Sequence, residues 1–236
     1  MQELIRANSL EDAKITAYHI GFVLGPCINA SGRLDTAARS LALLNAKTKE
    51  EAARLAGDLT ALNQSRKALT EKGKEEAIRI IETTELKNDR VLVVYLPDCH
   101  ESLAGIIAGR IREKYHRPAF VLTGGETSAK GSGRSIESYS MYEELVKCAD
   151  LMIQFGGHPM AAGLSIEEKN IEEFRRRLNV NCTLTDEELR PKIVIDVPMP
   201  VSYITKELVE QISLLEPFGK GNTKPVFSQK NLRVLD

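Results

Sequence analysis

The stretch Phe155-Gly-Gly-His-Pro-Met-Ala-Ala-Gly163 combines residues that decide how this part of the chain folds. The adjacent glycines Gly156 and Gly157 permit positive φ and carry no Cβ that would block an approaching group. Pro159 lacks a backbone donor and fixes its own φ, so the pattern predicts that His158 lies at a rigid bend outside any regular element. The stretch indicates a loop that presents one imidazole to a crevice. A structural turn with a hydrogen-bonded histidine is the alternative.

A second polar motif precedes this loop, in residues 128–135, which read Ser-Ala-Lys-Gly-Ser-Gly-Arg-Ser. Glycines at alternate positions are typical of a strand against which a ligand or another backbone can lie. Ser132 and Arg134 are two residues apart and would project together from the opposite face. A hydroxyl and a planar guanidinium suit a phosphate group, whereas an ordinary edge strand is the alternative interpretation.

Residues 91–122 predict a strand, a loop, a helix and a second strand, with boundaries at 91–96, 97–102, 103–114 and 119–122. The apolar run of the first strand is typical of a strand buried on both faces. His100 therefore lies in a loop at the carboxyl end of a strand, where open α/β sheets bind ligands. A residue that only opens the following helix is the alternative for His100.

Residues 25–35 are predicted to be a polar, glycine-punctuated connection, after a helix over 13–24 that Gly25-Pro26 ends. The connection carries three polar side chains: Asn29, Ser31 and Arg33. A helix over 36–45, capped by Asp35, would follow. An amide, a hydroxyl and a guanidinium before a helix N-terminus form a candidate anion site, and a solvated surface turn is the alternative.

Thr48 and Glu51 form a capping box for the longest predicted helix, which extends to about Thr84. At 1.5 Å per residue, such a helix would span roughly 50 Å. That length favours a helix that bridges two domains, with Gly73 as a point where it could be interrupted.

The remaining segments alternate between helices and strands. We predict helices over 140–154, 165–178 and 202–214, strands over 164–166, 192–197 and 225–235, and a linker over 179–186.

The composition is that of an ordinary soluble globular protein, with 42% hydrophobic and 28% charged residues among 236. The absence of tryptophan argues against a surface that stacks many bases, and the net charge of −1 requires any nucleic-acid contact to be local. The four cysteines show no disulfide or zinc spacing, and no apolar run is long enough to cross a membrane, which together favour a cytoplasmic location.

Together, several motifs along the chain resemble the RecJ family of single-strand-specific DNA exonucleases, within the DHH phosphoesterase superfamily. The motifs that carry the resemblance are Gly25-Pro-Cys-Ile-Asn-Ala-Ser-Gly-Arg33, His100 to Arg110 leading to Tyr115-His-Arg-Pro118, Gly131-Ser-Gly-Arg-Ser135, Phe155 to Gly163, and Leu215-Glu-Pro-Phe-Gly-Lys-Gly-Asn222. The Gly-Gly-His motif alone marks only the DHH-associated domain, which other phosphodiesterases share. One departure is Cys27, where related sequences commonly carry a basic residue.

The resemblance implies an α/β fold, with a DHH-associated domain whose central mixed sheet is flanked by helices. A long connecting helix would precede this domain and a partial OB-like segment would follow it. The implied boundaries are 1–46 for the end of the DHH domain, 47–86 for the connecting helix, 87–180 for the DHH-associated domain and 190–236 for the start of the OB-like domain. The DHH residues that bind Mn²⁺ or Mg²⁺ in this family do not occur in this sequence. We therefore expect a fragment that binds no metal and is inactive alone.

The resemblance also implies roles for individual residues. His158 is similar to the group that meets the reacting phosphate, and we treat it as the catalytic candidate. The implied substrate or phosphate contacts are Arg33, Ser132, Arg134, Asn29, Gly156, Gly157 and His100, and none of these residues is a metal ligand.

The implied function is the substrate-binding part of a metal-dependent 5′→3′ single-stranded-DNA exonuclease of recombination and repair. Its partners would be single-stranded DNA, a single-strand-binding protein and a helicase. Two alternatives remain: a relative that cleaves short RNA or cyclic dinucleotides, and a non-catalytic module that binds single-stranded nucleic acid. The OB-like segment favours the exonuclease over the first alternative.

Overall fold

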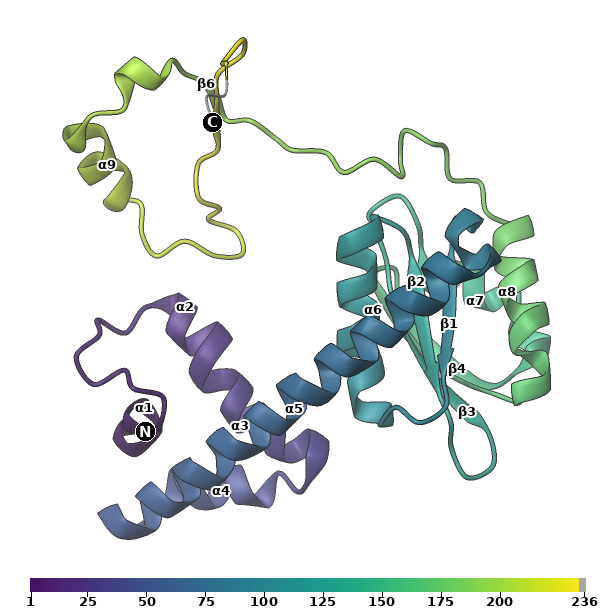
Figure 1. The fold of residues 1–236 in the computed structure, drawn as a ribbon, viewed down its shortest axis with the longest axis horizontal. Coiled ribbons are helices and arrows are strands. Elements are labelled where there is room, and N and C mark those ends of the chain that lie inside the picture. The colour runs from purple at the N-terminus through teal and green to yellow at the C-terminus, as the bar shows by residue number, and fades with distance from the viewer. Residues whose placement is uncertain (234–236) are drawn as a thin grey trace.

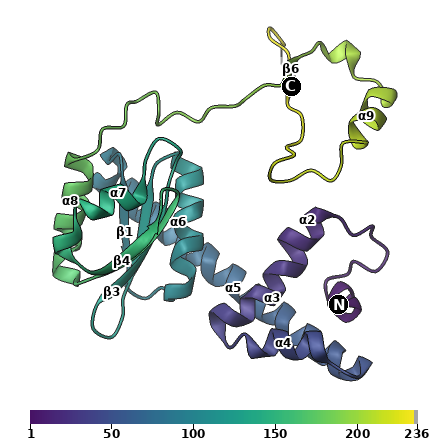
Figure 2. The ribbon, with the colours of Figure 1, turned by 180° about the vertical axis from the view of Figure 1, so that it is seen from behind.

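The computed structural model describes residues 1–233, which form a helical N-terminal part, an α/β part and a C-terminal segment (Figure 1). Helix α5 (Lys49–Thr83) connects the first two parts, and an extended stretch of chain leads to the C-terminal segment (Figures 1 and 2). Within residues 1–233, no helix has both the length and the apolar character needed to cross a bilayer.

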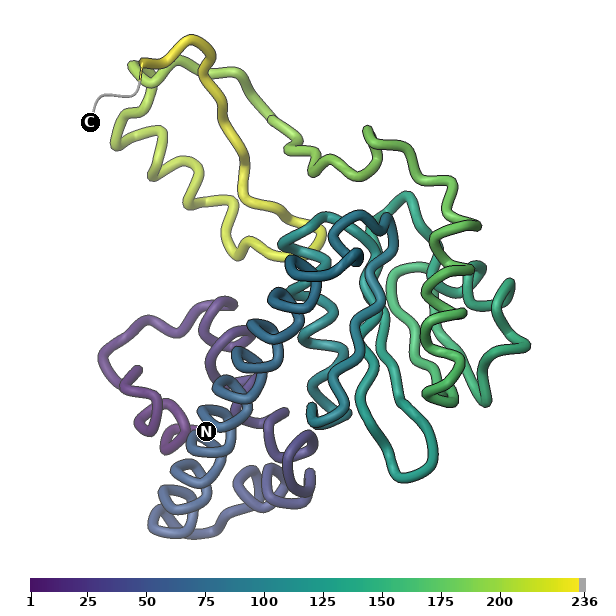
Figure 3. Tube along the Cα trace, turned by 45° about the vertical axis from the view of Figure 1, so that its right-hand side comes forward, coloured from purple at the N-terminus to yellow at the C-terminus, as the bar shows by residue number. Residues whose placement is uncertain are grey.

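The N-terminal part consists of short helices packed along one end of α5 (Figure 3). They are α1 (Gln2–Ala7), α2 (Ala17–His19), the π-helix η1 (Ile20–Leu24), α3 (Gly25–Leu34) and α4 (Ala38–Asn45). Their apolar side chains meet α5 in a buried core formed by Leu4, Leu24, Cys27, Leu43, Leu55, Ala56 and Leu59.

The prediction that a helix ends at Gly25-Pro26 is wrong, because α2, η1 and α3 follow one another without a break. The Gly25 N–H donates to the oxygen of Ile20, five residues earlier, in the widened π turn. Such a turn accommodates proline, which has no N–H and whose ring would clash with the carbonyl four residues before it. Residues 25–34 are therefore helical, where the sequence predicted a polar connection.

Helix α5 confirms the predicted long helix. Thr48 Oγ1 accepts a hydrogen bond of 3.2 Å from the Glu51 N–H and caps the first turn. The helix contributes Leu55 and Leu59 to the N-terminal core, and Ala77 and Ile81 to a second core beneath the sheet. Because it enters both cores, α5 joins the two parts of the molecule through packed side chains.

The α/β part is built on a five-stranded mixed sheet of order β1-β2-β3-β5-β4. Its strands are β1 (Leu92–Leu96), β2 (Ala119–Thr123), β3 (Ala129–Arg134), β4 (Met152–His158) and β5 (Ala161–Ile166). Strands β1 and β2 are parallel, because helix α6 (Glu101–Tyr115) crosses between them, and the other pairs are antiparallel.

Helices cover both faces of this sheet. Helices α5 and α6 pack on one face through a core that includes Ile81, Ile107 and Val94. Helices α7 (Met141–Val146) and α8 (Ile171–Val180) pack on the other face through Met141 and Phe174. The predicted fold class, a central mixed sheet flanked by helices and preceded by a long helix, is confirmed.

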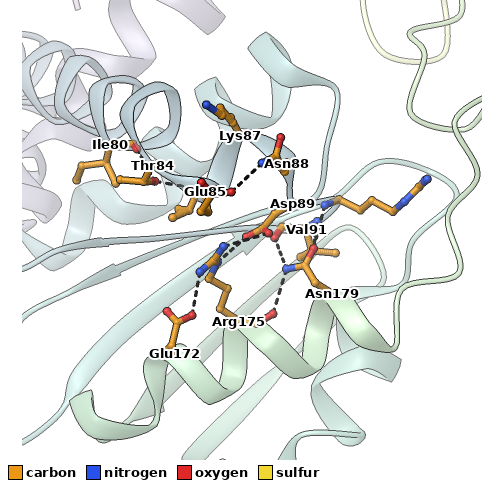
Figure 4. Close-up of polar contacts among 12 residues, drawn as sticks. Ile80, Thr84, Glu85, Lys87, Asn88, Asp89, Val91, Glu172, Arg175 and Asn179 are labelled. Atoms are coloured by element: carbon orange, nitrogen blue, oxygen red, sulfur yellow. Dashed lines mark hydrogen bonds and ion pairs between the residues drawn. The ribbon is translucent and has the colours of Figure 1, made fainter.

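A polar cluster fastens α8 to the start of β1 (Figure 4). Asn179 Oδ1 accepts hydrogen bonds of 2.9 and 3.0 Å from the N–H groups of Arg90 and Val91, and its Nδ2 donates to the Val91 oxygen at 3.0 Å. Arg175 donates from Nε and Nη2 to the two carboxylate oxygens of Asp89 at 2.5 and 3.1 Å. These contacts satisfy the backbone where the chain enters the sheet.

Two predicted boundaries near the sheet are wrong. The helix expected over 140–154 ends at Val146, a short 3₁₀ turn η3 (Ala149–Leu151) follows, and Met152 already begins β4. The helix expected from Ser165 begins at Ile171, after the 3₁₀ turn η4 (Glu168–Asn170), because β5 extends to Ile166. Ser165, the expected cap, pairs instead with Lys130 of β3 and Gln154 of β4 as part of the sheet. A further 3₁₀ turn, η2 (Glu85–Asn88), connects α5 to β1.

The C-terminal segment has less regular structure than the sequence predicted. The strands expected over 192–197 and 225–235 are reduced to β6 (Val197–Pro198) and β7 (Phe227–Ser228), and residues 234 and 235 lie outside the described part of the chain. The expected helix is divided into η5 (Val201–Tyr203) and α9 (Lys206–Ser213). Large apolar side chains of this segment remain exposed, Leu214 to 83%, because two short strands give them little to pack against.

Candidate phosphate-binding site

Strand β3 presents its polar side chains to one face of the sheet and its glycines to the other. A Cβ on Gly133 would lie 2.5 Å from the sulfur of Met141 and 2.6 Å from the Phe120 ring, so this face is closed by the core. Ser132 and Arg134 project to the opposite face, where a Cβ on Gly105 of α6 would lie 3.5 Å from the Ser132 Cβ. The alternation therefore places the predicted hydroxyl and guanidinium together, beside α6.

The Gly-Gly-His stretch is a β-hairpin, which corrects the prediction of an irregular loop. Residues 152–158 form β4, only Pro159 and Met160 turn, and β5 begins at Ala161. Gly157 has φ of +157°, and a Cβ there would lie 2.5 Å from the Ala161 oxygen. The glycine is required because the two strands approach closely at this point. His158 is the last residue of β4 and is exposed.

The strand register brings the predicted residues onto one face of the sheet. Arg134 is opposite Ala161, and Ala161 is opposite His158, so these residues form one row across β3, β5 and β4. The next row on the same face consists of Ser132, Gly163 and Gly156. Paired residues share a face, and so do residues two apart on one strand. Ser132, Arg134 and His158 therefore project from the same side of the sheet.

An open hollow of about 500 Å³ lies over this face beside α6. Its floor is thin, because Gly156 and Gly163 carry no side chain and a Cβ on Gly156 would meet nothing within 4 Å. Ser132 and Gly156 line the hollow, whereas Arg134 and His158 belong to the adjacent row at its edge. The hollow is open to solvent and large enough for a phosphorylated group.

Arg134 is held against α6 by close packing. A Cβ on Gly105 would lie 2.8 Å from Arg134 Nη2, so the guanidinium occupies the space that the glycine leaves free. Arg134 Nη1 donates a hydrogen bond of 2.7 Å to the Gly133 oxygen. Burial, and then the neighbouring Arg33, lower the pKa of the Arg134 guanidinium below its usual value. The side chain is thus a partly buried cation close to a second cation.

Arg33 reaches this region from α3, although the helical backbone replaces the predicted loop. Its Nη1 donates to the main-chain oxygen of Ser102 at 2.7 Å, and Ser102 lines the hollow. Asn29 lies one helical turn earlier on the same face of α3 and is exposed. Ser31, in contrast, is buried and its hydroxyl lies 2.7 Å from that of Ser40. The predicted anion loop does not exist, but α3 delivers Arg33 to the sheet.

Arg66 of α5 is a further cation that the sequence analysis missed. Burial and the neighbouring Arg33 lower the pKa of the Arg66 guanidinium. Its Nε and Nη2 donate to Asn63 Oδ1 at 3.1 and 3.0 Å, and Asn63 Nδ2 donates to the Cys27 sulfur at 3.3 Å. Arg66 stands among many charged residues of α5, so its position could be recognised only once α3 was packed beside it.

His100 lies beside this arrangement, because its Nδ1 is 2.8 Å from the hydroxyl of Ser102, which lines the hollow. It is the N-cap of α6, and its Nδ1 accepts a hydrogen bond of 3.3 Å from the Ser102 N–H. It lines a different hollow, of about 560 Å³, between α5 and the end of β1, together with residues such as Lys72 and Cys99. The structure places His100 at the entry of α6, which is one of its two predicted roles, and a phosphate contact of His100 stays a prediction.

The described residues contain no group of three or more His, Cys, Asp and Glu side chains that could hold a metal ion. The donors that surround the hollow are mainly hydroxyl, amide and cationic groups, which suit an anion better than a cation.

Comparison with known protein families finds a DHHA1 domain over residues 88–182 and a RecJ OB domain over residues 195–236. The "Single-stranded-DNA-specific exonuclease RecJ" of Salmonella typhimurium is 35% identical over 96% of this chain, which covers 41% of that protein. The protein of the same name from Bacillus subtilis is 34% identical over 95% of this chain, which covers 29% of it. This chain thus spans less than half the length of these relatives.

The fold agrees with this relationship. The crystal structure of RecJ from Thermus thermophilus in complex with Mg²⁺ matches 96% of this chain with a TM-score of 0.80 at 28% identity, and the chain covers 35% of that protein. The complex of the same protein with Mn²⁺ matches 97% of this chain with a TM-score of 0.80. On the sequence motifs, the two matched domains and the shared fold, the chain belongs to the RecJ family.

Proposed function

We propose that this chain is the substrate-binding part of a metal-dependent exonuclease that degrades single-stranded DNA in the 5′→3′ direction. The observation that carries the proposal is the common face of the sheet from which Ser132, Arg134 and His158 project, with Arg33 beside them. The names of the relatives, single-stranded-DNA-specific exonucleases, support the choice of substrate.

In this proposal the terminal 5′-phosphate binds between Ser132, Arg134 and Arg33. A phosphate monoester carries more negative charge than an internal diester, so neighbouring guanidiniums favour the end of a strand over its interior. The fork of Arg134 can donate two parallel hydrogen bonds, and the Ser132 hydroxyl can donate a third. Burial, and then the neighbouring Arg33, lower the pKa of the Arg134 guanidinium, and a bound anion would relieve the repulsion between the two cations. Asn29 would add a contact from α3.

His158 would face the next phosphate, where the bond is broken. It lies one register row from Ser132, on an exposed strand end that a substrate can reach. A donor at this position can stabilise charge that develops on the phosphate oxygens. Gly156 and Gly157 would act through their lack of side chains, by letting the strand approach the sheet. His100 would contribute from the start of α6, next to the Ser102 hydroxyl.

The reaction requires a divalent metal in this proposal, since the Thermus thermophilus relative binds Mg²⁺ and Mn²⁺. The residues described in this chain do not fit such an ion. We therefore propose that a DHH domain supplies the metal site, that residues 1–46 continue that domain, and that this chain alone is inactive. Residues 47–86 would be the connecting helix, 87–180 the substrate-binding domain and 190–236 the start of the OB-like domain.

The RecJ OB match favours DNA exonuclease over the alternative of an oligoribonuclease or cyclic-dinucleotide phosphodiesterase. A single-strand-binding protein and a helicase are further proposed partners, and the cytoplasm is the proposed location. An activity experiment distinguishes the exonuclease from the alternative of a non-catalytic binding module. Joined to a metal-binding DHH domain and supplied with Mn²⁺, the chain should degrade a single strand, whereas a module would remain inert.

The test of the binding site compares oligothymidylates that end in a 5′-phosphate or a 5′-hydroxyl, by fluorescence anisotropy with the chain of residues 1–236. We expect tighter binding of the phosphorylated strand, and Arg134→Ala should reduce this preference by about 1.5–3 kcal/mol, the usual range for a hydrogen bond to a charged group. Arg176→Ala is the control, because Arg176 is an exposed arginine of α8 paired with Glu173. An equal loss of affinity for both strands would contradict the proposal.

A further inference from the structure

The hollow over the sheet extends past the proposed site of the terminal phosphate to a third row of residues. This row consists of Lys130 on β3, Ser165 on β5 and Gln154 on β4. It follows the Ser132 row on the same face, two residues farther along each strand, which corresponds to about 6.7 Å. All three residues line the hollow.

The hollow lies on the side of Ser132 that is away from His158. The hollow is lined by the Ser132 row and the Lys130 row, and by neither Arg134 nor His158 of the first row. A phosphate held at Ser132 would therefore have the reacting position on one side and an open, polar space on the other. The terminal phosphate and the reacting phosphate, as proposed above, leave this space unfilled.

The side chains of the third row are suited to reversible binding of an anion. Lys130 Nζ lies 2.6 Å from Glu101 Oε2, and both side chains are about half exposed, so the ion pair can exchange with solvent or a ligand. Gln154 adds an exposed amide and Ser165 a half-buried hydroxyl. Glu101 is the acidic side chain that lines the hollow, and it competes with any anion for Lys130.

We infer that Lys130, Gln154 and Ser165 form a subsite for a second phosphoryl group, about one register row from the terminal phosphate. The inference rests on the proposed function, because it takes the Ser132 row as the site of the first phosphate. The source that fits is a further phosphate on a polyphosphorylated 5′ end, because the phosphodiester after the terminal nucleotide is proposed to lie at His158, on the other side of Ser132. Lys130 would then exchange Glu101 for that further phosphate.

Three small probes test the subsite: thymidine 5′-monophosphate, thymidine 5′-diphosphate and the 5′-phosphorylated dinucleotide pTpT, whose second phosphate is the reacting phosphodiester. Their binding to the chain of residues 1–236 is measured by calorimetry. Lys130→Gln should weaken binding of the diphosphate by about two- to fivefold, which corresponds to one exposed ionic contact. Binding of the monophosphate and of pTpT should not change. A loss for pTpT without a loss for the diphosphate would overturn the subsite, because Lys130 would then contact the reacting phosphodiester.

Glu101→Gln provides a change of opposite sign. Removal of the competing carboxylate frees Lys130, so thymidine 5′-diphosphate should bind about two- to fivefold more tightly. Lys169→Gln is the matched control, because Lys169 is also an exposed lysine paired with a glutamate, Glu167, but lies in η4 and does not line the hollow.

The two proposals fail in different ways. If the chain shows no preference for a 5′-phosphate and Arg134→Ala has no effect, the proposed function fails and this subsite fails with it. If Arg134→Ala removes the preference while Lys130→Gln leaves all three probes unchanged, only the second subsite is overturned. Equal weakening of the monophosphate by Lys130→Gln would also overturn it, because Lys130 would then serve the first phosphate.

Discussion

Arg33 Nη1 donates a hydrogen bond of 2.7 Å to the main-chain oxygen of Ser102, 69 residues later in the chain. The contact joins α3 to the first turn of α6, and it places a guanidinium beside the hollow that Ser102 lines. One side chain therefore links the position of the N-terminal helices to the composition of the candidate site.

Replacement of Arg33 should affect both properties. We expect Arg33→Ala to lower the free energy of unfolding by about 0.5–1 kcal/mol, because one hydrogen bond is lost at an exposed site. It should also weaken binding of 5′-phosphorylated oligothymidylate, while Arg33→Lys should retain part of that binding through its charge. Urea unfolding and fluorescence anisotropy measure the two effects. Arg54→Ala, at an exposed arginine paired with Asp58, should change neither.

Gly105 gives a way to move Arg134 without removing it. A Cβ at Gly105 would lie 2.8 Å from Arg134 Nη2, so Gly105→Ala should displace the guanidinium, whose flexible stem allows this at little cost in stability. We expect the preference for a 5′-phosphate to fall while the melting temperature stays the same or rises, since alanine favours the helix. Gly109→Ala is the control, because its Cβ would lie 4.0 Å from the Arg134 Cγ. Full preference in Gly105→Ala would show that the packing against α6 does not position Arg134.

The backbone requires glycine at Gly157, whereas the neighbouring Gly156 has space for a side chain. A Cβ at Gly157 would lie 2.5 Å from the Ala161 oxygen, and φ is +157°, so Gly157→Ala should destabilise the fold by about 1–3 kcal/mol. At Gly156 a Cβ meets nothing within 4 Å, and Gly156→Ala should leave the free energy of unfolding nearly unchanged. Denaturant titration of both variants tests this. Similar losses in the two variants would mean that the hairpin geometry is not what requires glycine.

Asn179 should be the most sensitive polar residue between α8 and the sheet. Asn179→Ala leaves the N–H groups of Arg90 and Val91 without their acceptor, and Val91 is fully buried. We expect a loss of about 1–3 kcal/mol in the free energy of unfolding. Asn179→Asp keeps the accepting oxygen and should lose less. Equal losses would indicate that the Nδ2 donors, and not the accepting oxygen, hold β1 in place.

The sequence predicted those elements whose signals are local. Thr48 and Glu51 marked the start of α5 because a capping box uses only residues three apart. The apolar run before Pro97 predicted β1, and the alternation in residues 129–134 predicted that Ser132 and Arg134 share a face. Each of these predictions needed no knowledge of distant contacts.

The wrong predictions depend on partners that are distant in sequence, or on rare geometry. The π turn at Ile20–Leu24 accommodates Pro26, and proline otherwise indicates a helix end. Residues 152–158 form a strand because β5 pairs with them, although their glycines and the following proline favour a loop. Arg66 escaped notice because its neighbour Arg33 comes from another helix. The position of His100 after a strand could not by itself distinguish its two predicted roles, and the hydrogen bond that caps α6 became visible only in the structure.

Helix α5 is fixed in a separate core near each of its ends, at Leu55 and Leu59 and again at Ala77 and Ile81. A change in the packing at one end of this helix therefore shifts the position of the other end. Over a length of roughly 50 Å, a tilt of about 5° at one end displaces the other by about 4 Å, which exceeds the length of a hydrogen bond. Substitutions in either core would therefore change the distance between Arg33 and Arg134, even where both arginines are intact.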